Sequence, residues 1–476
     1  MIYGAGQVAN KLIGLLVLPI FTTYLTPVDY GVIGVLAFIS FLIAPLFGLG
    51  LGISCGIAYY EKDSETRKDQ TIWTTFVLLG FSSVILLLVT MIFSKELSVL
   101  FFKSTTYNNF IILSVLTSIF NSILIQPFTL KLQLDNKAKL YVVLFVIANV
   151  VTLILNLFFV IILKRGVWGW VESGLISGLI TLVLFAIPTL KYTKFAVTYD
   201  LAKELIKLGL PLVPSFFFLF VIQHSSRYML ERYHDLQAVG IFTIGYNFGL
   251  AINLGVGSFT TAWYPYFTSF MNKQEETKFI FNRILTYYTY GFGTLVIMFF
   301  LFAKTALILL TQPQFYTAYT VVGFIALSQF FIGVFSLLVP GIYFNKETKY
   351  VNYVQVLSCI VVLLLNWLLI PRFAVIGAAL ATVGGVGSMA FFQYLLNNYR
   401  PYVKIEYEWI RLLKFAGLLI LAAAYAFYIA RYSWKLNLAL SLSGFIITLC
   451  IVWTFLTAAE KTLLINKLHI GVKINV

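Results

Sequence analysis

Two ionisable side chains, His224 and Arg227, lie in one long apolar segment of the sequence, residues 205–230. Residues three apart share a face of an α-helix. A charge at the centre of a membrane-spanning helix costs about 2.5 to 3.5 kcal/mol, so such a residue is retained where it is paired or faces a water-filled cavity. Arg227 is therefore a candidate for binding an anionic cargo. It is also four residues from Glu231, the spacing of an ordinary helical ion pair, and His224 could equally serve as a hydrogen-bonded packing residue.

Five further polar residues in apolar segments could line the same cavity. Lys11 lies early in the first apolar run beside Gln7 and Asn10, Glu172 lies near the start of another run, and Asn247 lies inside a third. Each has a structural alternative. The Lys11 ammonium can reach lipid headgroups from the membrane boundary, Glu172 can sit at the interface, and an amide such as Asn247 can hydrogen-bond between helices. The sequence leaves both interpretations open.

No arrangement of residues in the sequence predicts an enzyme. The chain has three His, no pair of carboxylates spaced for acid–base catalysis, no phosphate-binding P-loop and no zinc-spaced His-Glu motif. We therefore expect no cofactor, while coupling to H+ or Na+ stays open. Cys55, Cys359 and Cys450 lie far apart in apolar surroundings, which predicts free thiols.

The elements that hold these residues are membrane helices. Hydrophobic residues make up 60% of the 476, charged residues make up 11%, and the mean hydropathy is +0.93. These values indicate a polytopic, all-α membrane protein. The net charge of +15 could suggest nucleic acid as a partner, but Lys and Arg are divided among short loops between apolar runs. We interpret them as topology signals and expect no nucleic acid partner.

Fourteen apolar runs approach the 20 or so mainly apolar residues that a spanning helix needs. Their approximate ranges are 7–25, 31–60, 70–93, 108–130, 140–163, 167–190, 205–230, 236–264, 284–303, 316–344, 350–370, 374–396, 409–430 and 436–457. Loops on one side carry 23 Lys and Arg and loops on the other side carry 9. Because basic residues concentrate in cytoplasmic loops, both termini are expected in the cytoplasm.

The first twelve runs form two similar sets. An offset of 209 residues relates Tyr24 to Tyr233, Gly31 to Gly240 and Gly48 to Gly257, and the order of long helix, basic loop and glycine also repeats. This pattern predicts a parallel repeat of two six-helix units. The expected division is a first bundle at residues 1–190, a cytoplasmic linker at 191–203, a second bundle at 204–398, and two additional helices with a cytoplasmic tail at 399–476.

Several short motifs resemble one known family. They are Tyr24-Leu25-Thr26-Pro27-Val28-Asp29-Tyr30-Gly31, Pro45-Leu46-Phe47-Gly48-Leu49-Gly50, Tyr59-Tyr60-Glu61 and Gly209-Leu210-Pro211-Leu212-Val213-Pro214. In order and spacing the chain resembles the polysaccharide-exporter branch of the multidrug/oligosaccharidyl-lipid/polysaccharide (MOP) superfamily, which includes the Wzx-type O-antigen flippases. The resemblance implies a MATE-like fold, in which two six-helix bundles face a central cavity that opens alternately to either side. In that frame Asp29 and Tyr30 are expected to turn the chain and pack helices.

The resemblance also implies a cargo and partners. The cargo would be an undecaprenyl-diphosphate-linked oligosaccharide, such as a lipopolysaccharide repeat unit, moved from the inner to the outer leaflet of a bacterial inner membrane. The partners would be membrane lipids, a polysaccharide polymerase and chain-length machinery. A diphosphate is best received by Arg or Lys through charge-assisted hydrogen bonds. Relatives usually carry Asp before the arginine of the seventh helix, whereas Ser226 precedes Arg227 here.

Two other functions fit the sequence less well. A multidrug or cation antiporter of the same fold would need carboxylates in its cavity, and Asp and Glu are scarce within the spans. A membrane-embedded polysaccharide polymerase or ligase usually needs a sizeable outer loop, and the expected outer loops are short.

Overall fold

Every regular element that the computed structural model describes is a helix. The described residues are 14, 17–61, 65–191, 193–270, 274–340, 342, 347, 349–399, 407–458 and 460–462. Residues 7–13, 15 and 16 of the predicted first span lie outside them, and these include Gln7, Asn10 and Lys11. Residues 17–24 are helical and lead into the next helix.

The first half of the chain forms helices that cross the molecule in turn. They are α2 (Pro27–Phe47), α3 (Leu51–Glu61), α4 (Glu65–Ile92), α5 (Ser94–Phe102), η1 (Thr105–Tyr107), α6 (Asn108–Ser118), η2 (Ile119–Leu124), α7 (Gln126–Leu134), α8 (Ala138–Asn156), η3 (Leu157–Ile162) and α9 (Gly166–Leu190). Both η2 and η3 are π-helical turns, in which one extra residue widens the helix.

The second half repeats this layout after a short helix and ends in an additional pair. It comprises α10 (Tyr199–Gly209), η4 (Leu210–Leu212), α11 (Val213–Tyr233), α12 (Leu236–Gly249), η5 (Leu250–Ile252), α13 (Asn253–Thr268), α14 (Gln274–Leu310), η6 (Pro313–Ala318), α15 (Tyr319–Leu338), α17 (Lys349–Tyr399), α18 (Trp409–Ile429) and α19 (Trp434–Phe455). Across the described residues, twelve helical segments are long and apolar enough to cross a membrane.

The longest of these segments, α17, is two spans rather than one. A straight helix of its 51 residues would be about 77 Å long at 1.5 Å per residue, far more than a bilayer. The chain reverses at Ala374, whose φ is 46°, so that Gly377 packs against the carbonyl of Leu369 and Gly385 against Val362. The separate spans predicted at 350–370 and 374–396 are therefore confirmed, and with the first span the count of fourteen is consistent with the structure.

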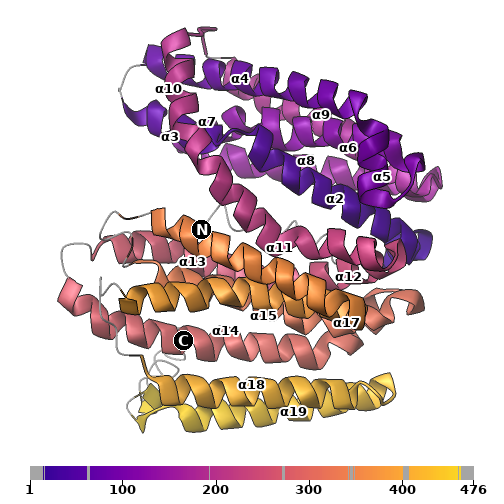
Figure 1. Cartoon of the computed structure of the whole chain (residues 1–476), viewed down its shortest axis with the longest axis vertical. Helices are drawn as coiled ribbons and strands as arrows, with labels where there is room; N and C mark the ends of the chain where they lie inside the picture. The colour runs from indigo at the N-terminus through magenta and orange to yellow at the C-terminus, as the bar shows by residue number, and fades with distance from the viewer. Residues whose placement is uncertain are drawn as a thin grey trace, which may run out of the picture.

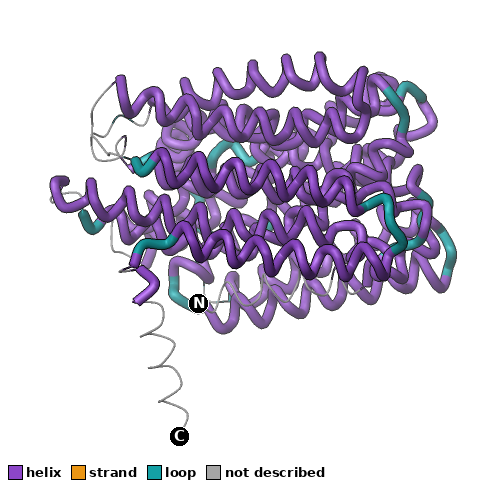
Figure 2. The backbone as a smooth tube through the Cα atoms, turned by 90° about the horizontal axis from the view of Figure 1, so that it is seen from below, coloured by secondary structure: helices purple, strands orange, loops and turns teal. Residues whose placement is uncertain are grey.

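Figure 1 shows two groups of helices, α3–α9 above and α13–α17 below, with the yellow α18 and α19 at the lower edge and α11 running between the groups. Figure 2 shows the helices side by side with their loops at two opposite ends. We call the end at which α10 lies the linker end and the opposite end, where α5 lies, the cap end. The predicted all-α architecture of two bundles and a C-terminal pair is confirmed.

At the cap end the same cap begins the second helix of each half. The Thr26 hydroxyl accepts the amide of Asp29 at 3.2 Å, and the Asp29 carboxylate accepts the amide of Thr26 at 2.8 Å. The Asp235 carboxylate accepts the amide of Ala238 at 2.8 Å. Both pairs are related by the 209-residue offset. Such caps satisfy otherwise unpaired helix amides, which explains why this stretch is polar between two apolar runs.

The predicted 31–60 span is interrupted. α2 ends at Phe47 and α3 begins at Leu51, with Leu49 and Gly50 both at positive φ between them. Gly209, at the end of α10, packs closely against the backbone of Leu49 and Gly50. A Cβ on Gly209 would overlap the Leu49 carbonyl, and a Cβ on Gly50 would overlap the Gly209 carbonyl. Only glycine allows this approach. The break therefore allows α10 to pack directly against the first bundle.

The C-terminal pair is joined to α14 by a charged cluster. Arg411 donates to the carboxylates of Glu408 at 2.8 Å and Glu460 at 2.7 Å, and its Nε donates to the Tyr290 hydroxyl at 3.1 Å. Burial alone would raise the pKa of Glu460, but hydrogen bonds from Arg411 and Thr457 lower it to about 2. The cluster thus links α18, α14 and the segment after α19.

We expect Arg411→Gln to lower the free energy of unfolding by about 2 kcal/mol, because two carboxylates lose a charged donor. Thermal unfolding of the purified protein in detergent measures this, with Lys414→Gln, an exposed residue of the same helix, as the control. A depressed carboxyl pKa stabilises the fold above the unfolded value of 4.5, and that contribution is lost as the pH falls toward 2. The difference between parent and variant should shrink over that interval; a difference independent of pH would contradict this account.

Candidate functional site

Arg227 lies in the interior of the molecule on α11. Its side chain is 3% exposed, and its Nη1 donates to the Nδ1 of His224 at 2.8 Å. Because a guanidinium can only donate, this imidazole nitrogen is the unprotonated one. The guanidinium carbon lies 4.2 Å from the centroid of the Tyr246 ring on α12, in cation–π geometry. The cation is therefore held by a neutral imidazole and an aromatic face.

Among the described residues no carboxylate lies within 4 Å of the Arg227 guanidinium. Glu231, the helical partner considered from the sequence, has its Oε1 3.8 Å from the Nζ of Lys103 instead. Ser226, which stands where relatives carry Asp, faces α17 and donates to Asn366 at 2.9 Å. A buried cation is costly when it has no anionic partner. The Nε–H of Arg227 is buried and donates to no group of the described residues.

His224 contacts both Arg227 and α2. Its imidazole stacks on the Phe41 ring, with centroids 4.6 Å apart and planes 8° apart. Phe38, one turn earlier on α2, packs against Phe220 of α11 with centroids 5.0 Å apart. These two contacts form an aromatic layer between α2 and α11, and Arg227 lies on its cap-end side.

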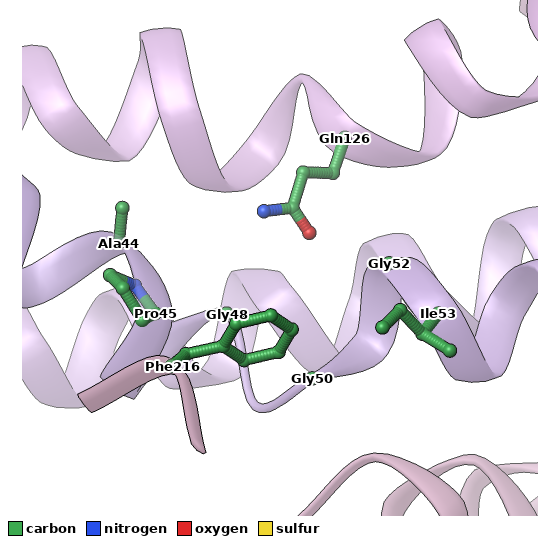
Figure 3. A pocket seen from close by; sticks show the side chains of 8 residues that line it. All are labelled: Ala44, Pro45, Gly48, Gly50, Gly52, Ile53, Gln126 and Phe216. Atoms are coloured by element: carbon green, nitrogen blue, oxygen red, sulfur yellow. The ribbon is translucent and has the colours of Figure 1, made fainter. Parts of the chain in front are cut away.

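On the linker-end side of this layer lies a cavity of about 300 Å³ (Figure 3). Its walls are Ala44, Pro45, Gly48, Gly50, Gly52, Ile53, Gln126 and Phe216. The Gln126 side chain points into it from α7, two residues after the π-helical η2 turn, and no described group donates to its buried Oε1. π-helical turns frequently occur at functional sites. Six of the eight wall residues thus come from residues 44–53, which comprise the end of α2, the break and the start of α3.

The cavity and the arginine lie along one track on α11. Phe216, Phe220 and His224 are four residues apart and share a helix face, and Arg227 follows three residues later. At 1.5 Å per residue, Phe216 and Arg227 are about 16 Å apart along the helix axis. The seam between α2 and α11 therefore carries aromatic rings and a cation in sequence, and the Gln126 amide of α7 shares the cavity with the first of these rings, Phe216.

A second cavity, of about 470 Å³, is apolar and lies in the second half. It is formed between α14, α15, α17 and α18, and its walls include Leu285, Phe331, Val383, Phe415 and Leu419. Thr289, Tyr394 and Tyr407 are its few polar residues. The first C-terminal helix thus closes one side of an apolar groove.

The other predicted site residues lie away from this seam or outside the described residues. Glu172 forms an ion pair with Arg165, with Nη1 and Oε2 2.8 Å apart, in a surface hollow that also contains Trp168. Asn247 is exposed and follows Tyr246 on α12. The structure therefore brings His224 and Arg227 together and keeps Glu172 in a local pair. Gln7, Asn10 and Lys11 stay predictions.

The sequence alone did not single out Phe41, Tyr246 or Phe216. All three are aromatic residues in a chain that is 17% aromatic, so their type carries no signal. Gln126 was one of several amides within spans, and only its position beside the break in α2 distinguishes it. These residues are found through the packing of α2 against α11 and α12, which the pattern of apolar residues does not determine.

Residues 1–271 of the chain match the sequence profile of a family described as polysaccharide biosynthesis protein. No curated protein sequence matches the chain closely enough to count as a relative.

Several solved structures share the fold. The lipid II flippase MurJ in an inward closed conformation superposes with a TM-score of 0.73 at 14% identity, over 95% of this chain and 98% of MurJ. An inward-facing multidrug resistance MATE transporter of the MOP superfamily superposes with a TM-score of 0.65 at 14% identity, over 84% and 94% of the two chains. A MOP superfamily transporter from Pyrococcus furiosus superposes with a TM-score of 0.57 at 16% identity, over 84% of this chain and 93% of that transporter. The chain therefore has the MOP fold.

A double-mutant cycle tests the contact between Arg227 and Tyr246. We expect a coupling free energy of about 1 to 2 kcal/mol between Arg227→Met and Tyr246→Leu, because the cation–π contact is desolvated. Thermal unfolding of the four proteins in detergent measures it. Tyr246→Phe, which keeps the ring, should retain most of the coupling with Arg227. Additive effects of the two changes would show that the ring does not stabilise the cation.

Proposed function

Because this chain belongs to the polysaccharide biosynthesis protein family, we propose that it is a flippase for lipid-linked oligosaccharides. The cargo is an oligosaccharide joined through a diphosphate to a polyprenyl chain such as undecaprenol. The protein moves the polar headgroup from the inner to the outer leaflet by exposing the α2–α11 seam to each side of the membrane in turn. The single observation that carries this proposal is Arg227, a buried cation without a carboxylate partner among the described residues.

Arg227 suits the diphosphate. A guanidinium offers a planar set of donors to phosphate oxygens, and such charge-assisted bonds are among the strongest in proteins. In the conformation described, Tyr246 and His224 hold the guanidinium through neutral contacts. An anion that reaches it when α2 and α11 move apart needs to displace no carboxylate. The site is therefore ready to receive a negative charge.

The cavity at the break in α2 suits a sugar. Sugars are bound through amides and through aromatic faces, and Gln126 and Phe216 supply one of each. The glycines of the same wall allow a ligand to approach the backbone. The track of about 16 Å between Phe216 and Arg227 then places a sugar and a diphosphate of one headgroup side by side along α11.

The apolar groove beside α18 suits part of the polyprenyl chain, which gains by leaving water and needs no polar contact. The protein lies in the inner membrane of a bacterium, with both termini in the cytoplasm, because the loops at the linker end carry most of the Lys and Arg. The cap end then faces outward. A polysaccharide polymerase and chain-length machinery would receive the cargo there.

A multidrug or cation antiporter is not favoured by the site. The walls of the α2–α7 cavity and the described surroundings of Arg227 contain no carboxylate that could hold a cationic drug. A polymerase or ligase would need a catalytic acid–base pair beside the sugar, and the described walls of that cavity contain no titratable group.

Reconstitution of the purified full-length protein tests the proposal. In liposomes that contain a polyprenyl-diphosphate oligosaccharide with a fluorescent sugar, we expect the protein to equilibrate the cargo between leaflets. Arg227→Ala should slow this at least about tenfold, since a charge-assisted contact is lost, and Arg227→Lys should retain part of the rate. Accessibility of the fluorophore to a membrane-impermeant quencher measures the rate.

Arg165→Ala, which removes an equally basic residue from the surface hollow, is the matched control and should move cargo like the parent. If the parent protein leaves the cargo in one leaflet, the proposed function is wrong. If Arg227→Ala is folded and moves cargo at the parent rate, the role of Arg227 is wrong while the function stands.

The sugar contact has its own test in the same liposomes. Gln126→Leu keeps the volume of the side chain and removes its hydrogen bonds, so we expect the half-saturating cargo concentration to rise about tenfold. Gln133→Leu, an exposed residue on the same helix, should change it little. Equal values for the two variants would exclude Gln126 from the sugar site.

A further inference from the structure

At the cap end the two halves meet backbone to backbone. Gly31 of α2 packs on the carbonyl of Leu236 at the start of α12, and Gly240 of α12 packs on the carbonyl of Pro27 at the start of α2. A methyl group on either glycine would overlap the carbonyl oxygen that it faces. The contact is therefore closed only because both residues are glycine.

This contact is symmetric in sequence. Gly31 and Gly240 differ by 209 residues, and so do Pro27 and Leu236. One half therefore contacts the other through the same two positions, each used twice, as in a two-fold interface. We call these four residues the glycine seam. Such a seam joins the two halves of a duplicated protein and belongs to neither half alone.

A charged contact lies beside the seam. Lys103, in the loop after α5, donates from Nζ to the carbonyl oxygen of Glu231 at 2.6 Å and lies 3.8 Å from the Glu231 carboxylate. It also reaches the carbonyl of His234 at 3.4 Å. These carbonyls end α11, where the helix dipole favours a cation. The Glu231 side chain is 4% exposed, so the pair is largely shielded from solvent on the carboxylate side.

The second half makes the corresponding contact with neutral groups. Gln312, which is 209 residues after Lys103, donates from Nε2 to the Thr23 hydroxyl at 3.0 Å. Gln314 donates to the carbonyl of Thr22 at 3.3 Å, and Thr22 is 209 residues before Glu231. Each outer loop thus reaches the end of the first helix of the opposite half. One of the two contacts is ionic and the other is not.

We infer that the glycine seam and these two loop contacts form a releasable gate at the cap end, and that the Lys103 contact is the stronger of its two latches. A charge-assisted hydrogen bond is roughly twice as strong as a neutral one. Loss of the Lys103 contact therefore opens the gate in more molecules than loss of the Gln314 contact with Thr22. Opening separates α2 from α12 and moves the end of α11, one turn beyond Arg227.

The inference concerns the conformations of the protein itself and needs no assumption about the cargo. It can be tested on the empty protein, so it can fail while the proposed function holds, and the reverse is also possible. Val28 and Gln237, which are 209 residues apart and exposed, flank the seam and provide sites for labels.

The experiment measures the distance between spin labels at Val28→Cys and Gln237→Cys by double electron–electron resonance in lipid nanodiscs. Cys450, the exposed native thiol, is replaced by Ser, while Cys55 and Cys359 are buried. The variants are Gly240→Ala, Lys103→Gln and Gln314→Leu. Their controls are Gly80→Ala, where an added methyl meets no atom within 4 Å, and Lys95→Gln, a neighbouring surface lysine.

The parent should give mainly a short distance. Gly240→Ala should shift most of the distance distribution to longer values. Lys103→Gln should raise the ratio of long-distance to short-distance molecules about tenfold, and Gln314→Leu should raise it less. Lys103→Arg should restore the short distance. Because Lys103 lies in a surface loop, its variants report on the gate even if Gly240→Ala does not fold.

The inference is overturned if Lys103→Gln keeps the distance distribution of Lys95→Gln. It is also overturned if a folded Gly240→Ala keeps that of Gly80→Ala. A larger change for Gln314→Leu than for Lys103→Gln would overturn the ranking of the two latches.

Discussion

The close approach of α2 and α12 at the cap end is the constraint on which the rest of the structure depends. A helix pair can meet at this distance only where no side chain intervenes, and glycine provides that at Gly31 and Gly240. The halves also meet at the linker end, where Gly209, just before α11, packs on the backbone of Leu49 and Gly50, just after α2. The break in α2 and the cavity beside Gln126 lie on that side, and the buried Arg227 lies between the cavity and the seam.

The charged residues near the glycine seam also have separate roles. A cation inside a membrane protein is normally paired, and Lys131, for example, has Asp135 within 3.5 Å. Arg227 is held instead by an imidazole and a ring, while the nearby Glu231 turns to Lys103 of the other half. The acidic residue is thus used to join the halves, while the basic residue has no carboxylate partner among the described residues and, in our proposal, binds an anion. That division of roles is a physical basis for a transporter of anionic headgroups.

Much of the fold could be predicted from the sequence, because membrane spans and caps depend on local composition. The polar stretch around Thr26 and Asp29 predicted a turn, and its caps and its repeat around Asp235 appear in the structure. The site was only partly predictable. The spacing of His224 and Arg227 put them on one face, but their contacts with Phe41 and Tyr246 depend on how helices rotate against each other. Glu231 was an equally good local partner by spacing and was taken by Lys103, which is 128 residues away.

The most direct test of the account is whether cargo occupies the α2–α11 seam. A photo-reactive benzoylphenylalanine at Phe216, which faces the cavity, can be compared with one at Phe217, which is 36% exposed and is not a wall residue of the cavity. In membranes supplied with a radiolabelled polyprenyl-diphosphate oligosaccharide, the account predicts a labelled adduct at Phe216 that excess unlabelled cargo removes. An adduct no stronger at Phe216 than at Phe217, or one that unlabelled cargo does not reduce, would contradict it.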